Sequence, residues 1–140
     1  MKERLPVFAA ALWWGSLTTV GCWVVPMLFA NLATPAIAGN MAARLFSAQT
    51  WVSAVCGLLL LMATSEKFRS NQADSEAEWP KSALIFIVGG VLLALLSEFA
   101  VAPRIVAREN LRLWHGVGSG MYLLQWLASA VVLWKAAARR

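Results

Sequence analysis

No charged side chain occurs between Arg4 and Arg44, and three further apolar blocks follow this stretch. Since a helix rises 1.5 Å per residue, about 20 apolar residues cross the ~30 Å hydrocarbon core of a bilayer. Only Glu98 places a charge inside one of the later blocks. The pattern predicts one all-α domain over residues 1–140, an antiparallel bundle of four transmembrane helices. The expected helices cover residues 5–32, 35–65, 82–103 and 110–136.

Composition favours a membrane fold over a soluble one. Hydrophobic residues make up 60% of the chain and charged residues 14%, against about 45–50% and 25% in soluble domains. The net charge is +5, but the basic residues lie at the ends of the apolar blocks and form no helical stripe. This distribution argues against nucleic-acid binding and predicts the lipid bilayer, with its anionic headgroups, as the partner. The first apolar run is too long for a signal peptide and is predicted to be a retained helix.

Lysine and arginine are unevenly divided between the two predicted sides of the membrane. One side holds both chain ends and a polar loop over residues 66–81, and it carries eight basic residues. The other side carries four: Arg44, Arg104, Arg108 and Arg112. Because loops rich in Lys and Arg stay on the cytoplasmic side, both termini are predicted to be cytoplasmic, in a bacterial inner membrane.

Prolines and tryptophans suggest where the helices begin, bend and end. Thr34 is a suitable N-cap and Pro35 a suitable first residue for the second helix. Pro26 falls inside the first span and is expected to kink it, whereas Pro103 is expected to end the third span. Trp114 and Trp134 are twenty residues apart, about 30 Å along a helix. They are expected to bracket the fourth span as interfacial residues.

Glu98 is the sharpest candidate for a functional residue. It lies six residues before Arg104, about 9 Å inside that end of the span. A charge at mid-bilayer costs about 2.5–3.5 kcal/mol, so such a group normally faces the bundle interior and has a partner. We expect Glu98 to be the charge centre of a polar cluster and Arg44 its counter-ion. The predicted orienting groups are His115, Asn40, Gln49 and Ser119. A structural ion pair is the alternative.

The fourth predicted helix carries a polar stripe and a pair of small residues. His115, Ser119 and Tyr122 share one helical face and are expected to point inward. Gly116 and Gly120 form a small-xxx-small pair, which favours close helix packing within the bundle and is compatible with a homo-oligomer. No internal repeat is evident in the residue pattern.

Few residues could support enzymatic chemistry. The sequence offers no nucleophile–base pair, phosphate loop or pair of carboxylates, so an enzyme is not expected. Cys22 and Cys56 lie inside apolar blocks, and no metal-ligand spacing joins them to the methionines. No cofactor is predicted. His115, the single histidine, is the residue that would ligate haem or copper in the alternative reading.

Several motifs resemble a known family. They are Leu12-Trp13-Trp14-Gly15-Ser16, Val25-Pro26-Met27-Leu28-Phe29, Ala38-Gly39, Leu45-Phe46 and Trp114-His115-Gly116. They are similar to the bacterial branch of the transmembrane-protein-205-like family, catalogued as domain-of-unknown-function family 4149. The resemblance implies a small four-helix membrane protein with no agreed activity. An animal relative is associated with tolerance of platinum drugs, which hints at transport or metal handling.

The resemblance also gives the motifs a physical rationale and leaves three functions open. Pro26 would bend the first helix, Gly15 would thin one of its faces, and Gly39 would let the outer crossover lie close to that bend, shaping a niche between the first two helices. Such niches bind solutes in membrane proteins. We therefore expect binding or transport of a small solute, ion or lipid. The alternatives are a haem- or metal-binding redox module, as in more remote copper-resistance-D-like families, and a non-catalytic scaffold or assembly factor.

Overall fold

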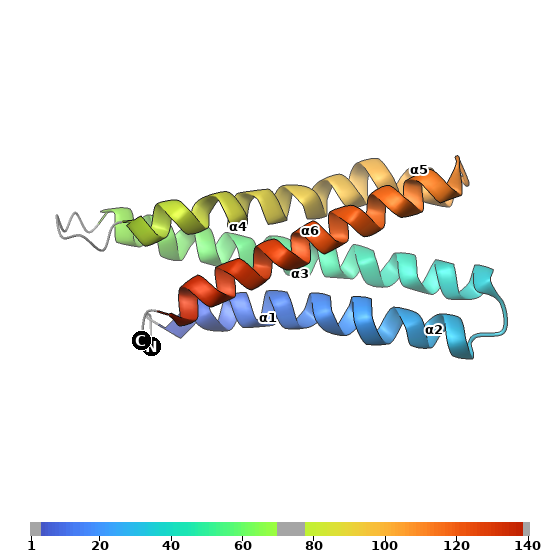
Figure 1. Ribbon diagram of the computed structural model, residues 1–140, viewed down its shortest axis with the longest axis horizontal. Coiled ribbons are helices and arrows are strands. Elements are labelled where there is room, and N and C mark those ends of the chain that lie inside the picture. Colours follow the sequence, from blue (N-terminus) through green and yellow to red (C-terminus); the bar gives the residue numbers. More distant parts are fainter. Residues whose placement is uncertain (1–3, 70–77, 139–140) are drawn as a thin grey trace.

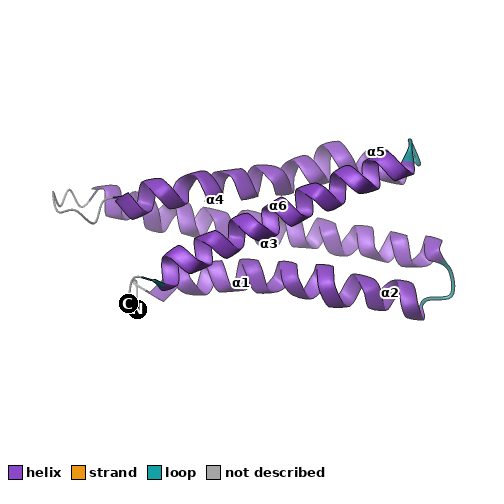
Figure 2. Cartoon of the chain, in the orientation of Figure 1, coloured by secondary structure: helices purple, strands orange, loops and turns teal. Residues whose placement is uncertain are grey.

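The protein is a bundle of four long helical rods, as the computed structural model shows (Figure 1; Figure 2). The structure describes residues 4–69 and 78–138, and every regular element within them is a helix. In chain order the elements are α1 (Leu5–Thr19), η2 (Val20–Val24), α2 (Val25–Asn31), α3 (Pro35–Arg69), α4 (Glu78–Leu96), η3 (Ser97–Val101), α5 (Ala102–Val106) and α6 (Leu111–Ala137). The symbols η2 and η3 denote short π-helices.

The eight elements combine into four antiparallel rods. The first is α1–η2–α2, the second α3, the third α4–η3–α5 and the fourth α6, and they run alternately along the long axis (Figure 1). Each rod contains a segment long and apolar enough to cross a membrane. The segments are Leu5–Asn31, Pro35–Ser65, Ser82–Val106 and Leu111–Ala137. The predicted all-α bundle of four transmembrane helices is confirmed.

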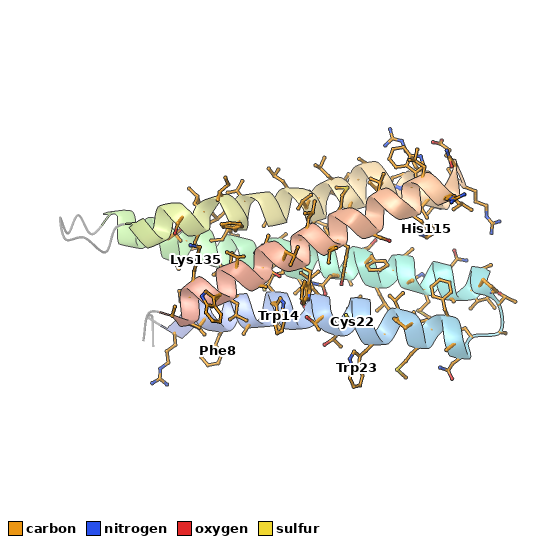
Figure 3. All side chains as sticks on the ribbon, viewed as in Figure 1. Phe8, Trp14, Cys22, Trp23, His115 and Lys135 are labelled. Carbon is orange, nitrogen blue, oxygen red and sulfur yellow. The ribbon has the colours of Figure 1, made fainter. Side chains whose placement is uncertain are left out.

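Lipid-facing residues cover the outside of the bundle. Phe8, Trp23 and Ile85 are about two-thirds exposed or more, and Figure 3 shows Phe8 and Trp23 pointing away from the other helices. In water such a surface would be costly, but lipid tails solvate it. Trp134 is 78% exposed near the end of α6, the place expected of an interfacial residue. The exposed apolar belt therefore supports a multi-pass membrane protein.

The helix ends between the second and third rods differ from the predicted ones. The helix α3 continues to Arg69 and α4 begins at Glu78, so the predicted polar loop over residues 66–81 is shorter than expected, and residues 70–77 lie outside the described part. At the start of α3 the prediction is confirmed, because the Ile37 amide donates to Thr34 Oγ1 at 3.3 Å and Pro35 is the first helical residue.

Pro26 and Pro103, the prolines in the middle of the first and third rods, each follow a π-helix. Proline lacks an N–H and its ring crowds the carbonyl four residues earlier. A π-helix widens the preceding turn: the Val25 amide bonds the Val20 carbonyl, and the Ala102 amide bonds the Ser97 carbonyl, each five residues back. The prediction that Pro103 ends the third span is wrong, since the widened turn lets the helix continue to Val106. Pro26 is accommodated in the same way.

The glycines that permit close packing are not those that the sequence suggested. A Cβ added to Gly15, Gly39, Gly116 or Gly120 would meet nothing within 4 Å. Intrachain packing thus does not require these glycines, and the close approach expected at the Gly116–Gly120 pair is absent.

Three other glycines lie against side chains of neighbouring helices. A Cβ on Gly21 would lie 2.7 Å from the Tyr122 ring, one on Gly57 2.3 Å from Val91, and one on Gly90 2.8 Å from the Trp13 ring. The side chain of Trp13 is itself fully buried. Residues on all four rods form the core around it: Ala9, Ala10, Trp13, Leu17, Cys56, Leu60, Ala83, Ile87 and Val132.

Candidate functional site

Glu98 lies inside the bundle, on the π-helix η3, and is half-buried. Its Oε1 accepts a hydrogen bond from Ser47 Oγ on α3 at 2.7 Å. Such a short bond from a hydroxyl to a carboxylate is a strong, charge-assisted interaction. Because π-helices within regular helices are frequently found at functional sites, η3 and its carboxylate form the first candidate for such a site.

The polar cluster predicted around Glu98 is only partly assembled. Arg44 and Asn40 on α3, and His115 and Ser119 on α6, are exposed. Within the described part of the chain, no hydrogen bond or ion pair joins Glu98 to Arg44 or His115. A role for these four residues in ligand binding stays a prediction. The group that contacts Glu98 differs from the predicted one, because the Ser47 hydroxyl lies where the Arg44 counter-ion was expected.

The polar stripe on α6 does not point inward as a whole. His115 and Ser119 are exposed, whereas Tyr122 is half-buried and donates to the Leu17 carbonyl at 2.7 Å. Figure 3 places His115 near the N-terminal end of α6. That end of the helix is largely uncovered by the other rods, since most residues between 111 and 120 are exposed. The prediction of a continuous inward stripe is therefore wrong.

Gln49 contributes to a different polar group, at the centre of the bundle. Its Nε2 donates to Ser16 Oγ on α1 at 2.9 Å. Gln125 Nε2 on α6 donates to Ser53 Oγ on α3 at 2.8 Å, and Ser53 Oγ in turn donates to the Gln49 carbonyl at 2.9 Å. Both amides are almost fully buried. These bonds connect three rods at one depth, as polar residues do between membrane helices.

A second pair of contacts joins α6 to α1 beside the glutamine bonds. Trp126 Nε1 donates to Thr18 Oγ1 at 2.8 Å, and the Trp126 ring lies 5.9 Å from the Trp14 ring between centroids. Both residues are half-buried. Tyr122, Gln125 and Trp126 on the inner face of α6 thus each donate to a neighbouring helix, and their donors are not free to bond a ligand. We interpret this central group as a structural polar core, and Gln49 as part of it.

Three buried polar atoms have no hydrogen-bond partner among the described residues: Trp13 Nε1, Trp14 Nε1 and Ser97 Oγ. A buried donor without a partner costs about 1–3 kcal/mol. Ser97 directly precedes Glu98 on η3. An unpaired hydroxyl and a carboxylate with one neutral partner thus follow each other on the same π-helix.

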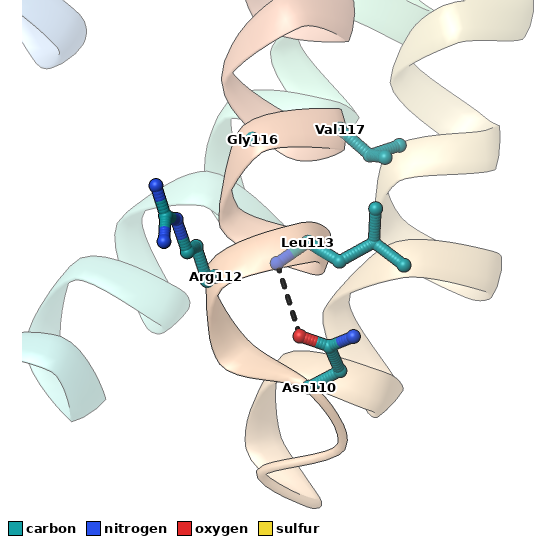
Figure 4. A pocket seen from close by; sticks show the side chains of 5 residues that line it. All are labelled: Asn110, Arg112, Leu113, Gly116 and Val117. Atoms are coloured by element: carbon teal, nitrogen blue, oxygen red, sulfur yellow. Dashed lines mark hydrogen bonds between the residues drawn. The ribbon is translucent and has the colours of Figure 1, made fainter.

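The end of the bundle at the start of α6 contains positive charge, and the depression described there has no convergent polar groups. Arg104 lies over the Trp114 ring at 4.6 Å from its centroid and also donates to the Ala100 carbonyl. A shallow depression at the start of α6 is lined by Asn110, Arg112, Leu113, Gly116 and Val117. In Figure 4 the Asn110 amide caps the helix through the Leu113 N–H, while the Arg112 side chain points away from Leu113 and Val117. This depression therefore lacks convergent polar groups and is a weak candidate.

The described residues contain no group of three or more His, Cys, Asp or Glu side chains that could hold a metal ion. Both cysteines are free thiols, Cys22 exposed and Cys56 buried. Nothing in the described geometry gathers them around His115.

The four apolar rods define an α-helical, multi-pass membrane protein, and the described residues place a carboxylate and a central polar group inside its bundle. The family model described as "Domain of unknown function (DUF4149)" matches residues 8–113. The chain therefore belongs to this family. The matched region contains Ser47, Glu98 and both π-helices. Comparisons with curated proteins and with solved structures gave no match.

Proposed function

We propose that this protein binds a small cationic solute at Glu98 as part of its movement through, or retention in, the membrane. The proposal depends on which groups contact the Glu98 carboxylate. A half-buried carboxylate accepts one bond from a neutral hydroxyl, and the part of the chain that the structure describes supplies no bonded cation. A charge inside a membrane protein is normally neutralised by a partner or marks an ion path. A cation from outside the chain would supply the missing charge.

The polarity of the surroundings favours a cation over an anion. Glu98 and Ser47 offer acceptor oxygens at this depth, whereas Arg44, Arg104 and Arg112 are exposed toward the outer end of the rods. An anion would have to sit beside the carboxylate to reach the bundle interior. Like charges at such distances repel, so an anionic ligand is disfavoured.

The position of the site supports access from the outer side. Glu98 lies eight residues before Val106, the end of its span, and sixteen after Ser82, its start. The distribution of Lys and Arg favours a bacterial inner membrane with cytoplasmic termini, which places Glu98 in the outer half of the bilayer. The uncovered outer half of α6 would leave a lateral approach from that side.

Carbodiimide labelling tests the proposal. Hydrophobic carbodiimides modify carboxyl groups that lie inside membrane proteins, and the adduct is located by mass spectrometry of the digested protein. We expect Glu98 to be labelled in protein reconstituted in liposomes. A bound cation should protect it, so at ten times its Kd labelling should slow about tenfold. The probes are sodium, potassium, methylammonium and tetraphenylphosphonium chlorides at constant ionic strength.

The matched control is Glu109, an exposed carboxylate in the turn after α5. Labelling of Glu109 by a water-soluble carbodiimide should not respond to the cations, and Glu98→Gln should remove the protected adduct while leaving that of Glu109 unchanged. If Glu98 is labelled at the same rate with and without every cation, the proposed function is contradicted.

A further inference from the structure

The first and third rods carry the same features at a constant distance in sequence. Ser97–Val101 follows Val20–Val24 by 77 residues, and Pro103 follows Pro26 by the same number. The buried positions of the two rods agree as well. Four pairs, each 77 residues apart, are buried in both rods: Pro6 and Ala83, Ala10 and Ile87, Trp13 and Gly90, Leu17 and Ala94.

The second and fourth rods agree in the same way at a distance of 76 residues. Both contain a glutamine followed four residues later by a serine, and all four of these residues are buried. The next buried positions correspond too. The pairs are Gln49 and Gln125, Ser53 and Ser129, Cys56 and Val132, and Leu60 and Ala136. These correspondences indicate an internal repeat that the residue pattern alone did not suggest, carried by buried positions and by the two π-helices with their prolines.

Two helical hairpins with the same orientation thus form the bundle as parallel repeats. Parallel repeats in membrane proteins are related by an axis along the membrane normal. Equivalent residues of the hairpins meet across such an axis: the Trp13 ring lies against Gly90, and the Phe46 ring lies 5.4 Å from the Tyr122 ring. Phe46 and Tyr122 are 76 residues apart, as the repeat requires.

This repeat defines what faces Glu98. Its equivalent in the first hairpin is Gly21, and the Tyr122 ring rests directly on Gly21, 2.7 Å from the position of an added Cβ. The equivalent of Tyr122 is Phe46, so Phe46 should face the turn of η3 that carries Glu98. The Ser47–Glu98 bond brings this turn of α3 against η3, and Ser47 follows Phe46 directly in the chain. Phe46 is about one-third exposed, which leaves part of its ring uncovered.

We propose that the ligand of Glu98 is an organic cation with an apolar body, held by the Glu98 carboxylate and the Phe46 ring in a niche between the two hairpins. This inference rests on the proposed function. At the corresponding position of the first hairpin, Gly21 stands in place of the carboxylate and the Tyr122 ring lies against it. Of these two equivalent positions, the one at Glu98 carries the negative charge that a cation needs.

The residues of the niche match an organic cation better than a metal ion. Calcium and magnesium take six or more oxygen ligands, several of them carboxylates or carbonyls, and the described contacts at this position are one carboxylate and the Ser47 hydroxyl bonded to it. An organic cation needs one counter-charge and apolar contacts, and aromatic rings stabilise it further through cation–π attraction. The surrounding apolar surface and the bilayer accept its body.

Equilibrium dialysis of two ions of the same shape tests this inference. The probes are radiolabelled tetraphenylphosphonium, a cation, and tetraphenylborate, an anion, with purified protein in detergent. We expect saturable binding of the cation that tetraphenylborate does not displace. Glu98→Gln should weaken it more than tenfold, and Phe46→Leu about threefold to fivefold. The control Phe99→Leu removes a lipid-facing ring next to Glu98, 67% exposed, and should leave binding unchanged.

Each remaining outcome is decisive. Phe46→Tyr keeps the aromatic ring and should retain binding of the cation. If Phe46→Leu elutes as aggregate, Phe46→Tyr still tests whether binding depends on the ring. Equal effects of Phe46→Leu and Phe99→Leu would overturn the role of Phe46. If sodium, potassium or methylammonium protects Glu98 from carbodiimide and tetraphenylphosphonium neither protects it nor binds, the ligand class is wrong and the proposed function stands. If no cation protects Glu98, both proposals fail.

Discussion

Replacing Gly90 with leucine is expected to destabilise the bundle by about 3 kcal/mol, the upper end of the range for overpacked cores. A Cβ at this position would lie 2.8 and 2.9 Å from two atoms of the Trp13 ring and 3.6 Å from Ala128. Trp13 is fully buried and belongs to the central core, so its ring has no free space to move into. The free energy of unfolding in mixed micelles, titrated with a denaturing detergent, measures the effect.

The neighbouring Gly89 provides the matched control. A Cβ on Gly89 would meet nothing within 4 Å, so Gly89→Leu should change stability by less than about 0.5 kcal/mol. The double substitution Gly90→Leu with Trp13→Ala should recover part of the loss, because it removes the clashing ring. Equal effects of the two leucines would contradict the packing of Trp13 against Gly90.

Trp13→Ala alone is expected to cost about 3 kcal/mol, the low end of the range for Phe and Trp truncations in cores. The hydrophobic transfer term is small in a bilayer, because lipid tails are as apolar as the core. The van der Waals contacts of a fully buried indole are lost all the same, and a cavity remains at the point where both hairpins meet. Detergent-dependent unfolding of the purified variant measures this cost.

Trp13→Phe separates packing from hydrogen bonding at the same position. The indole Nε1 is buried and has no partner among the described residues, so replacing it removes an unsatisfied donor, worth about 1–3 kcal/mol. We expect Trp13→Phe to retain most of the stability that Trp13→Ala loses. If Phe were as damaging as Ala, the Nε1 group would have a bonding role that the geometry does not contain.

The four spans could be predicted because the bilayer sets a length that the charge pattern reveals. Arg4, Arg44 and Glu66 delimit the first two spans in the sequence, and the structure agrees closely. The ends of the helices were harder to predict. A proline such as Pro103 normally ends a helix, but the π-helix η3 accommodates it and the helix continues. No single residue type predicts a π-helix.

Of the residues at the candidate site, only Glu98 could be predicted from the sequence. Glu98 stood out because a carboxylate in an apolar block is costly, but the rotation of each helix about its axis decides which residues meet it. Ser47 faces Glu98 while Arg44, one turn earlier on α3, is exposed. Hydropathy does not distinguish these orientations in a membrane, since lipid-facing and core residues are both apolar.

One signal in the sequence was available and missed. A glutamine followed by a serine four residues later occurs at Gln49 and again at Gln125. Matching these two positions brings Phe46 into register with Tyr122 and exposes the duplication. This register gives the residues that face each other across the pseudo-axis, such as Trp13 and Gly90, and it relates the Tyr122–Gly21 contact to the proposed position of Phe46 beside Glu98.

Cross-linking in the membrane tests most directly whether Glu98 faces Ser47 inside the bundle. The two native thiols, Cys22 and Cys56, are first replaced by alanine. Ser47→Cys combined with Glu98→Cys should then be joined by a short thiol-to-thiol cross-linker, detected by mass spectrometry of the digested protein. Ser47→Cys combined with Phe99→Cys, whose ring position faces lipid, should not react. The opposite result, with residue 99 joined to residue 47 and residue 98 left free, would contradict the position of the carboxylate and with it the proposed site.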